Sequence, residues 1–237
     1  MIQIARTTLR SLFITLAAIG SVSLAAPDAT ACGGGWWPEV QVDHRVEGLA
    51  GAEKDLAEGR YHQAAGKIIR MIPHIHAYSS GAKDPIINRS IRVLAVASMR
   101  SGGDLSALDT ELPDELRAEF AGASPEARKA NVEWSVTALS ALRKQKKDDA
   151  TLKSELAEAR AQIPELQQKA RKTLEILARK DLITSPEAYR ALARLRAAAG
   201  DEAGHATALE RCRNMARDAA ICDLGSTPAT LAIAGES

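Results

Sequence analysis

The sequence predicts an all-α protein in which antiparallel helical hairpins stack as a short α-solenoid or pack as an irregular helical bundle. Apolar residues recur with helical spacing in most segments beyond residue 43, and no segment has a convincing strand pattern. Alanine is abundant whereas aromatic residues make up only 3% of the chain, a balance that favours closely packed helices over a β-sandwich. Turns that contain glycine or proline separate the helical segments.

The first predicted hairpin extends from Asp43 to Pro73. Asp43 is the expected N-cap of its first helix. The apolar residues expected on one face of that helix are Val46, Leu49, Ala50, Leu56 and Ala57. A second helix is expected from Tyr61 to Met71, and only Gly59-Arg60 separates it from the first. Because this connection is short, the two helices are expected to fold back on each other.

Residues 58–65, EGRYHQAA, have a familiar spacing in which a glycine is followed by a tyrosine two positions later and an alanine three positions after that. This spacing resembles the tetratricopeptide repeat (TPR), over about one 34-residue unit. In that family the glycine lets two helices approach, the tyrosine fills the space between them, and the alanine permits close contact. The resemblance implies that Gly59, Tyr61 and Ala64 are repeat-packing residues and that the hairpins stack as a TPR-like solenoid.

Later segments continue the helical pattern up to residue 223. An apolar helix is expected over 86–99, and the letters SPEA at 124–127 and 185–188 are helix starts with serine as N-cap and proline in the first turn. Residues 152–177 have a four-three spacing for which a coiled coil is one interpretation. Pro164 favours two antiparallel helices or one kinked helix instead. We expect seven to nine helices in a helical repeat domain at 43–223, followed by a disordered tail at 224–237.

Residues 1–31 have the pattern of a secretory signal peptide. Arg6 and Arg10 precede an uncharged run over 11–26, and Ala29-Thr30-Ala31 is an A-x-A cleavage site. The run is shorter than the roughly 20 apolar residues that a membrane span needs. A retained membrane anchor and a buried N-terminal helix are the alternatives. The prediction places the protein in the bacterial periplasm or at the outer membrane.

Cys32 would be the first residue of the mature protein. A signal peptide that ends directly before cysteine resembles a bacterial lipoprotein signal, in which the thiol receives a diacylglycerol. Such a signal usually has leucine where Ala29 stands, so ordinary cleavage stays open beside lipidation. Membrane association through a lipid on Cys32 is therefore one of two expectations. Residues 32–42, with three glycines and two tryptophans, are expected to form a tether.

The chain has three cysteines, and export would place them in an oxidising compartment where disulfides persist. If Cys32 carries a lipid, Cys212 and Cys222 remain as a candidate disulfide pair that a turn after a helix could bring together. If Cys32 is free, one cysteine is left over. The absence of a C-x-x-C motif argues against a zinc ribbon and against a thioredoxin-type redox site.

Charge and motifs argue against several classes of function. Residues 1–31 hold two of the 31 basic and one of the 30 acidic residues, so the exported chain would be neutral and a nucleic-acid partner is not expected. No G-x-S-x-G nucleophile elbow and no phosphate-binding P-loop are present. Glu155 and Glu158 form a carboxylate pair of the kind that is common on helix surfaces. No cofactor and no catalytic residue are predicted.

His74 and His76, with His62 upstream, are the strongest candidates for metal ligands. Histidine is a common ligand, and two histidines at alternate positions can converge in an extended segment. No third ligand is marked and Pro73 places the pair in a loop, so solvated histidines are the simpler interpretation. We assign no metal site.

Helical-repeat proteins bind other molecules along the surface that stacked units create. The sequence therefore favours a non-enzymatic protein–protein interaction or scaffold module of the cell envelope, with a protein or peptide partner. Two alternatives stay open. One is an exported metal-binding protein or enzyme that uses His62, His74 and His76, and the other is a structural envelope protein without a discrete ligand.

Overall fold

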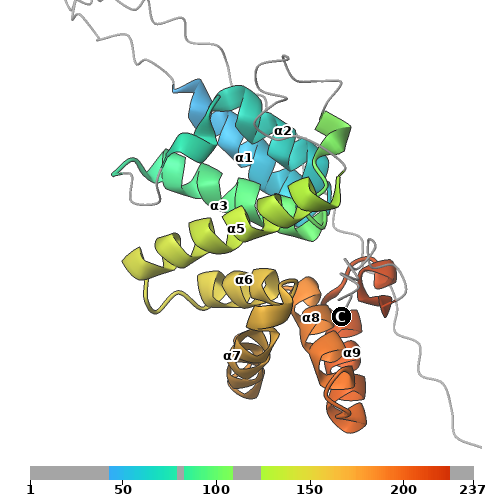
Figure 1. The fold of residues 1–237 in the computed structure, drawn as a ribbon. Coiled ribbons are helices and arrows are strands. Elements are labelled where there is room, and N and C mark those ends of the chain that lie inside the picture. Colours follow the sequence, from blue (N-terminus) through green and yellow to red (C-terminus); the bar gives the residue numbers. More distant parts are fainter. Residues whose placement is uncertain (1–42, 79–82, 109–123, 225–237) are drawn as a thin grey trace, which may run out of the picture. The chain divides into compact units, whose positions relative to one another are not determined.

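A computed structural model describes residues 43–78, 83–108 and 124–224, all of which belong to one compact unit, residues 42–237. Eight α-helices, four short 3₁₀ helices and no strand occur in these ranges, which confirms the predicted all-α fold class (Figure 1). The predictions about the signal peptide, Cys32, the tether and the segment 225–237 concern residues outside the described ranges.

The first hairpin has the predicted boundaries. α1 (His44–Ala57) begins after Asp43, whose carboxylate accepts a hydrogen bond from the Arg45 backbone N–H at 3.0 Å. α2 (Tyr61–Met71) follows a turn in which Gly59 has φ of 77°, a conformation that glycine adopts without strain.

The apolar face predicted for α1 is only partly right, because Leu49 is buried and Leu56 packs against the core but the other three predicted residues are exposed. Val46 is 53% exposed, and the buried residues of the helix are Leu49, Ala52 and Asp55. Asp55 enters the interface because the Lys67 ammonium of α2 lies 2.6 Å from its carboxylate. The pattern of apolar residues does not fully predict the buried face of α1, because this face consists of one leucine, one alanine and an aspartate that forms an ion pair.

The remaining α-helices start at side-chain N-caps in most cases. They are α3 (Pro85–Arg100), α5 (Pro125–Gln145), α6 (Ala150–Arg160), α7 (Gln167–Arg179), α8 (Pro186–Ala197) and α9 (Glu202–Met215), and the 3₁₀ helices are η1 (Ile75–Ala77), η2 (Ser106–Leu108), η3 (Pro164–Leu166) and η4 (Ala219–Cys222). The Ser124 hydroxyl accepts a hydrogen bond from the backbone N–H of Ala127 at 3.2 Å. The Ser185 hydroxyl accepts the equivalent bond from Ala188, also at 3.2 Å, as the repeated SPEA letters predicted.

Pro164 separates two helices, as one of the open interpretations had it. α6 ends at Arg160, the proline begins η3, and α7 then packs against α6. A continuous coiled coil is therefore wrong for residues 152–177. Proline lacks the N–H that a helix interior requires, and its ring clashes with the preceding turn.

The helices pair in chain order as α1 with α2, α3 with α5, α6 with α7, and α8 with α9. The first helices of successive pairs also touch, since α1 contacts α3, α3 contacts α6, and α6 contacts α8 (Figure 1). Each pair thus packs against the next one along the chain, an arrangement typical of stacked hairpins.

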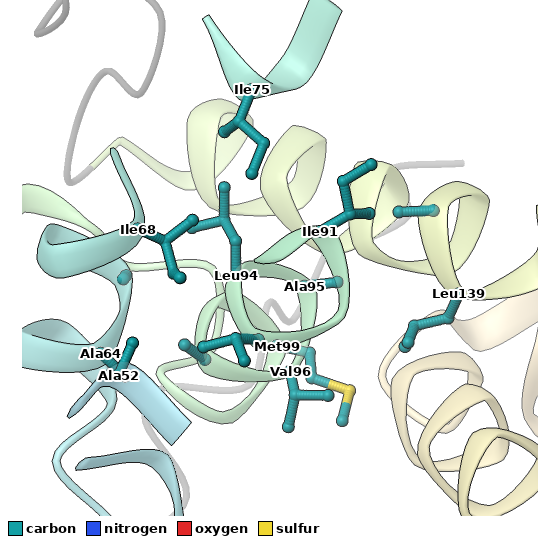
Figure 2. Close-up of a cluster of buried hydrophobic side chains, with 14 of the residues drawn as sticks. Ala52, Ala64, Ile68, Ile75, Ile91, Leu94, Ala95, Val96, Met99 and Leu139 are labelled. Carbon is teal, nitrogen blue, oxygen red and sulfur yellow. The ribbon is translucent and has the colours of Figure 1, made fainter. Parts of the chain in front are cut away.

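Two clusters of buried side chains lie on either side of α6. The first joins α1, α2, α3, α5 and α6 and includes Leu94 and Leu139 (Figure 2). The second joins α6 to the four elements α7, α8, α9 and η4 and includes Leu192. Ala159 of α6 belongs to the first cluster and Ala157 to the second. Because α6 is covered on both sides, three of its polar residues, Ser154, Glu155 and Glu158, are buried as well.

Cys212 and Cys222 form a disulfide in this structure, with an S–S distance of 2.06 Å and a Cα–Cα distance of 5.9 Å. The bond joins α9 to η4 and lies in the second cluster. The predicted pairing after the end of a helix is confirmed.

Candidate functional site

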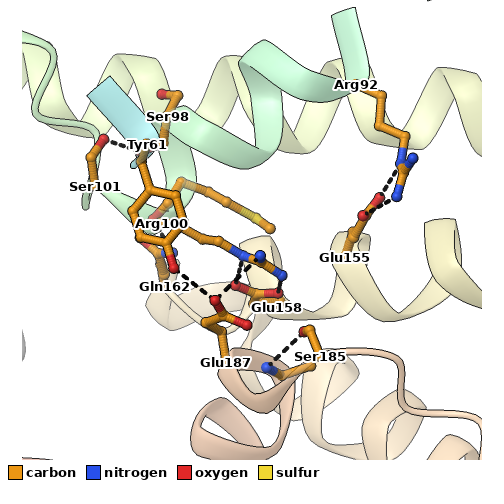
Figure 3. Close-up of polar contacts among 12 residues, drawn as sticks. Tyr61, Arg92, Ser98, Arg100, Ser101, Glu155, Glu158, Gln162, Ser185 and Glu187 are labelled. Atoms are coloured by element: carbon orange, nitrogen blue, oxygen red, sulfur yellow. Dashed lines mark hydrogen bonds and ion pairs between the residues drawn. The ribbon is translucent and has the colours of Figure 1, made fainter. Parts of the chain in front are cut away.

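Three charged side chains meet where α3, α6 and α8 come together. The Arg100 guanidinium donates to both carboxylate oxygens of Glu158, at 3.0 and 3.1 Å, and lies 3.3 Å from the carboxylate of Glu187 (Figure 3). The side chains of Arg100, Glu158 and Glu187 are 9%, 5% and 7% exposed. Such burial of charged groups requires the mutual pairing that the structure provides.

Tyr61 brings the first helical pair into this cluster. Its hydroxyl donates to Glu187 Oε1 at 2.7 Å, and its ring lies beneath the Arg100 guanidinium, 6.0 Å from the centroid (Figure 3). The hydrogen bond joins α2 to α8 across 126 positions of sequence. The tyrosine singled out by the TPR resemblance therefore links the first and fourth helical pairs through one hydrogen bond. We call Tyr61, Arg100, Glu158 and Glu187 the charge cluster.

The charge cluster contains one more carboxylate than it has cations. Burial raises the pKa of Glu158, and repulsion from the Glu187 carboxylate raises it further. The attraction of Arg100 lowers the pKa of Glu158 but does not offset these effects. Burial alone would lower the pKa of Arg100, but the two carboxylates outweigh burial and raise it. Burial and the Glu187 carboxylate also raise the pKa of Tyr61, which keeps its hydroxyl protonated. Arg100 thus stays charged and the tyrosine remains a donor.

A cavity of about 320 Å³ adjoins the charge cluster, with Arg100, Glu158 and Glu187 among its lining residues. Apolar side chains line much of the remainder; they include Met99, Val132, Ala161, Ala191 and Leu195. Exposed residues complete the lining, among them Lys129, Pro164, Glu165 and Ala198, so the cavity opens to the surface. Its walls come from α3, α5, α6, η3 and α8.

Local hydrogen bonds fix the backbone beside this cavity. The Gln162 side-chain amide donates to the Met99 carbonyl at 2.6 Å, and Arg194 Nη2 donates to the Ala161 carbonyl at 2.9 Å. Both bonds hold the connection between α6 and η3, one to the end of α3 and the other to α8. Hydrogen bonds therefore connect the segment after α6, which lines the cavity, to both α3 and α8.

None of the three residues predicted from the TPR resemblance is among the residues that line the cavity. Ala64 is fully buried in the first cluster, which fits a packing role. Gly59 is exposed in the turn between α1 and α2, where its positive φ explains the choice of glycine. Of the three predicted repeat-packing residues, only Tyr61 reaches the charge cluster.

The three candidate histidines have separate surroundings. His62 Nε2 lies 2.9 Å from the Asp104 carbonyl, and the His76 ring packs against Trp134 with 4.2 Å between centroids. His74 adopts a left-handed conformation, with φ of 60°, before η1. In the part of the chain that the structure describes, no group of three or more His, Cys, Asp or Glu residues could hold a metal ion.

The prediction that Glu155 and Glu158 lie on a helix surface is wrong. They are 5% and 4% exposed, and each is paired with an arginine of α3. Their spacing looked like that of a surface pair because both occupy one face of α6, but α3 covers that face. The sequence signal that could have found them is the presence of Arg92 and Arg100, two of the three arginines in a segment that is otherwise largely apolar.

No protein-family model matches the chain, and no curated protein or solved structure matches it significantly. Within the described ranges, none of the helices has both the length and the apolar character that are needed to cross a membrane.

Proposed function

We propose that the protein is a non-enzymatic interaction module that holds a segment of a partner protein in the cavity beside the charge cluster. The cavity is the observation that carries the proposal. Its volume of about 320 Å³ lies at the lower end of the range for ligand pockets, about 300–1,000 Å³. With a mouth at the surface, it suits one or two anchoring side chains of a larger molecule.

The charge cluster supports a binding role for this cavity because its members already pair with one another. Arg100 is engaged by Glu158 and Glu187, and Tyr61 donates to Glu187. These contacts keep the wall formed by α3, α6 and α8 in one arrangement before any partner arrives. Preorganisation of this kind lowers the entropy cost of binding.

We also propose that the module works in the bacterial cell envelope, after export and either free or anchored by a lipid on Cys32. The signal-peptide pattern of residues 1–31 supports export. Measuring the intact mass of the native protein, purified from membrane and from soluble fractions, distinguishes the free form from the lipid-anchored form. A chain that starts at Cys32 and carries a diacylglycerol would support the anchored form, whereas a chain that keeps residues 1–31 would refute cleavage of a signal peptide.

Blocking the cavity mouth tests the binding role. Ala198 lines the cavity and is exposed, so Ala198→Trp should obstruct the cavity without disturbing a buried contact. Ala206, an exposed residue of α9, supplies the matched control Ala206→Trp. Tagged proteins would be crosslinked in intact cells and the captured proteins quantified by mass spectrometry.

We expect at least one captured protein to fall about tenfold with Ala198→Trp and to remain with Ala206→Trp, a change worth about 1.4 kcal/mol. If both variants capture the same proteins as the wild type does, the cavity is not the binding site. If the wild type captures nothing above an untagged control, the interaction role itself fails.

A further inference from the structure

Two arginines of α8 line the cavity without an acidic partner. Arg190 and Arg194 are both half-buried lining residues. The Arg190 side chain forms no hydrogen bond or ion pair within residues 43–78, 83–108 and 124–224. Arg194 donates to the Ala161 carbonyl, which is neutral. The α8 wall therefore presents two positive charges with no counterion in the described part of the chain.

Their spacing brings these charges close together. Residues four apart on a helix are neighbours on one face, separated by roughly 6 Å along the axis. Like charges at this spacing repel, and burial together with the Arg190 charge lowers the pKa of Arg194. A carboxylate bound between the two guanidiniums would relieve that repulsion and could accept hydrogen bonds from both.

The carboxylates that line the cavity cannot perform this role as the structure stands. Glu158 and Glu187 lie against Arg100, and no salt bridge joins either of them to Arg190 or Arg194. Glu165 is exposed on η3 and also forms no ion pair with them within the described residues. On the α8 wall, the charged side chains without an ion-pair partner in the described residues are therefore the two arginines.

We propose that the partner segment presents an aspartate or glutamate side chain that binds Arg190 and Arg194, next to an aliphatic side chain that packs on Val132 and Leu195. This inference rests on the proposed function, because it specifies what that same cavity binds. Val132 and Leu195 are 6% and 5% exposed and supply the apolar part of the lining. The site thus combines a cationic subsite, formed by the two arginines, with an apolar one. Arginine is among the residues that are enriched at interface hot spots.

A peptide is favoured over a nucleic acid as the source of the anion. The whole chain has a formal net charge of +1, and the exposed lining residues Lys129 and Glu165 carry opposite charges, so the cavity lining does not extend the positive charge of the two arginines. Nucleic-acid binding relies on several phosphate contacts along such a surface. One carboxylate beside one aliphatic group matches the size and charge of this cavity.

The test is a selection from a display library of random eight-residue peptides against immobilised full-length protein, with unselected library as the reference. We expect the enriched peptides to contain aspartate or glutamate next to leucine, isoleucine or valine. Their affinity, measured by fluorescence anisotropy with one synthetic selected peptide, should fall at least tenfold when its acid is replaced by the matching amide. Arg190→Gln and Arg194→Gln should each cause a similar loss.

Arg213→Gln is the matched control, because Arg213 is an exposed arginine of α9 with no ion-pair partner in the described ranges. It should leave affinity unchanged. Circular dichroism would verify folding of each variant. Should Arg194→Gln unfold, Arg190→Gln decides alone, since no hydrogen bond in the described structure depends on Arg190.

The outcomes separate this inference from the proposed function. Peptides that are selected without acidic enrichment, or that bind Arg190→Gln as well as wild type, would overturn the carboxylate assignment but leave a binding cavity. A library that yields no peptide blocked by Ala198→Trp would overturn both. If a variant ending at Leu224 binds a selected peptide tenfold more tightly than the full chain, residues 225–237 compete for the cavity, and the assignment to a partner is wrong.

Discussion

Replacing Arg100 by methionine should lower the free energy of unfolding by about 3–5 kcal/mol, the usual cost of leaving buried charges without their partner. The structure supports the upper part of this range. Arg100 is 9% exposed and contacts two carboxylates, Glu158 and Glu187, that are each less than a tenth exposed. Methionine fills a similar space, so the loss should come from the two uncompensated charges rather than from a cavity.

Arg89→Met supplies the matched control on the same helix. Arg89 also forms a two-pronged pair with a glutamate, Glu53, at 3.0 and 2.6 Å, but its side chain is 53% exposed. Exposed pairs contribute about 0.2–1 kcal/mol, because water screens both charges. The two variants therefore compare the same chemistry in buried and in solvated surroundings.

Urea unfolding followed by far-ultraviolet circular dichroism measures both effects, with the slope of free energy against urea checked for equality between variants. The triple variant Arg100→Met, Glu158→Gln, Glu187→Gln should recover most of the stability, since it removes the stranded charges as well. An Arg100→Met protein that is no less stable than Arg89→Met would refute the account of the charge cluster, and so would a triple variant no more stable than the single one.

Three further results are expected. Gly103→Ala should cost about 1–3 kcal/mol more than Gly200→Ala in urea unfolding. Both glycines have φ near 75°, but a Cβ at Gly103 would lie 2.1 Å from the Arg128 carbonyl oxygen, whereas nothing lies within 4 Å at Gly200; equal losses would contradict the close approach. Replacing both Cys212 and Cys222 by serine should lower stability by about 2–3 kcal/mol, because the disulfide closes a loop of ten residues in the unfolded chain. A variant as stable as the oxidised wild type would show that the bond contributes nothing. Finally, burial raises the pKa of Glu158 above its ordinary 4.5, so its contribution to stability is present below pH 4.5 and is lost as pH rises through the higher folded-state pKa. The stability of wild type minus that of Glu158→Gln should therefore fall from pH 4 to pH 7; a constant or rising difference would contradict the assignment.

Helix ends were predictable because they depend on neighbouring residues. Asp43, Ser124 and Ser185 each cap a helix through a backbone N–H two or three positions away. The stop at Pro164 is equally local, since it follows from the missing proline N–H. The disulfide between Cys212 and Cys222 was also within reach, because a short separation after a helix limits the geometry.

The candidate site depended on contacts between residues far apart in sequence. Tyr61 could be singled out by its spacing from Gly59 and Ala64, but its partner Glu187 lies 126 positions later. Glu158 has the same local surroundings as a surface glutamate, and it is buried because α3 and α8 pack against α6. The charge cluster and the cavity could therefore be found only once it was known which helices pack against each other.

The most direct test of the central claim places a photoreactive benzophenone amino acid at the cavity mouth in living cells. Lys129 is an exposed lining residue, and Glu210 is an exposed residue of α9 outside the lining, so these positions form a matched pair. If the cavity holds a partner, position 129 should give a discrete protein adduct that is absent from position 210 and disappears with Ala198→Trp. No adduct at position 129, or the same adducts from both positions, would contradict the claim that the cavity holds a partner.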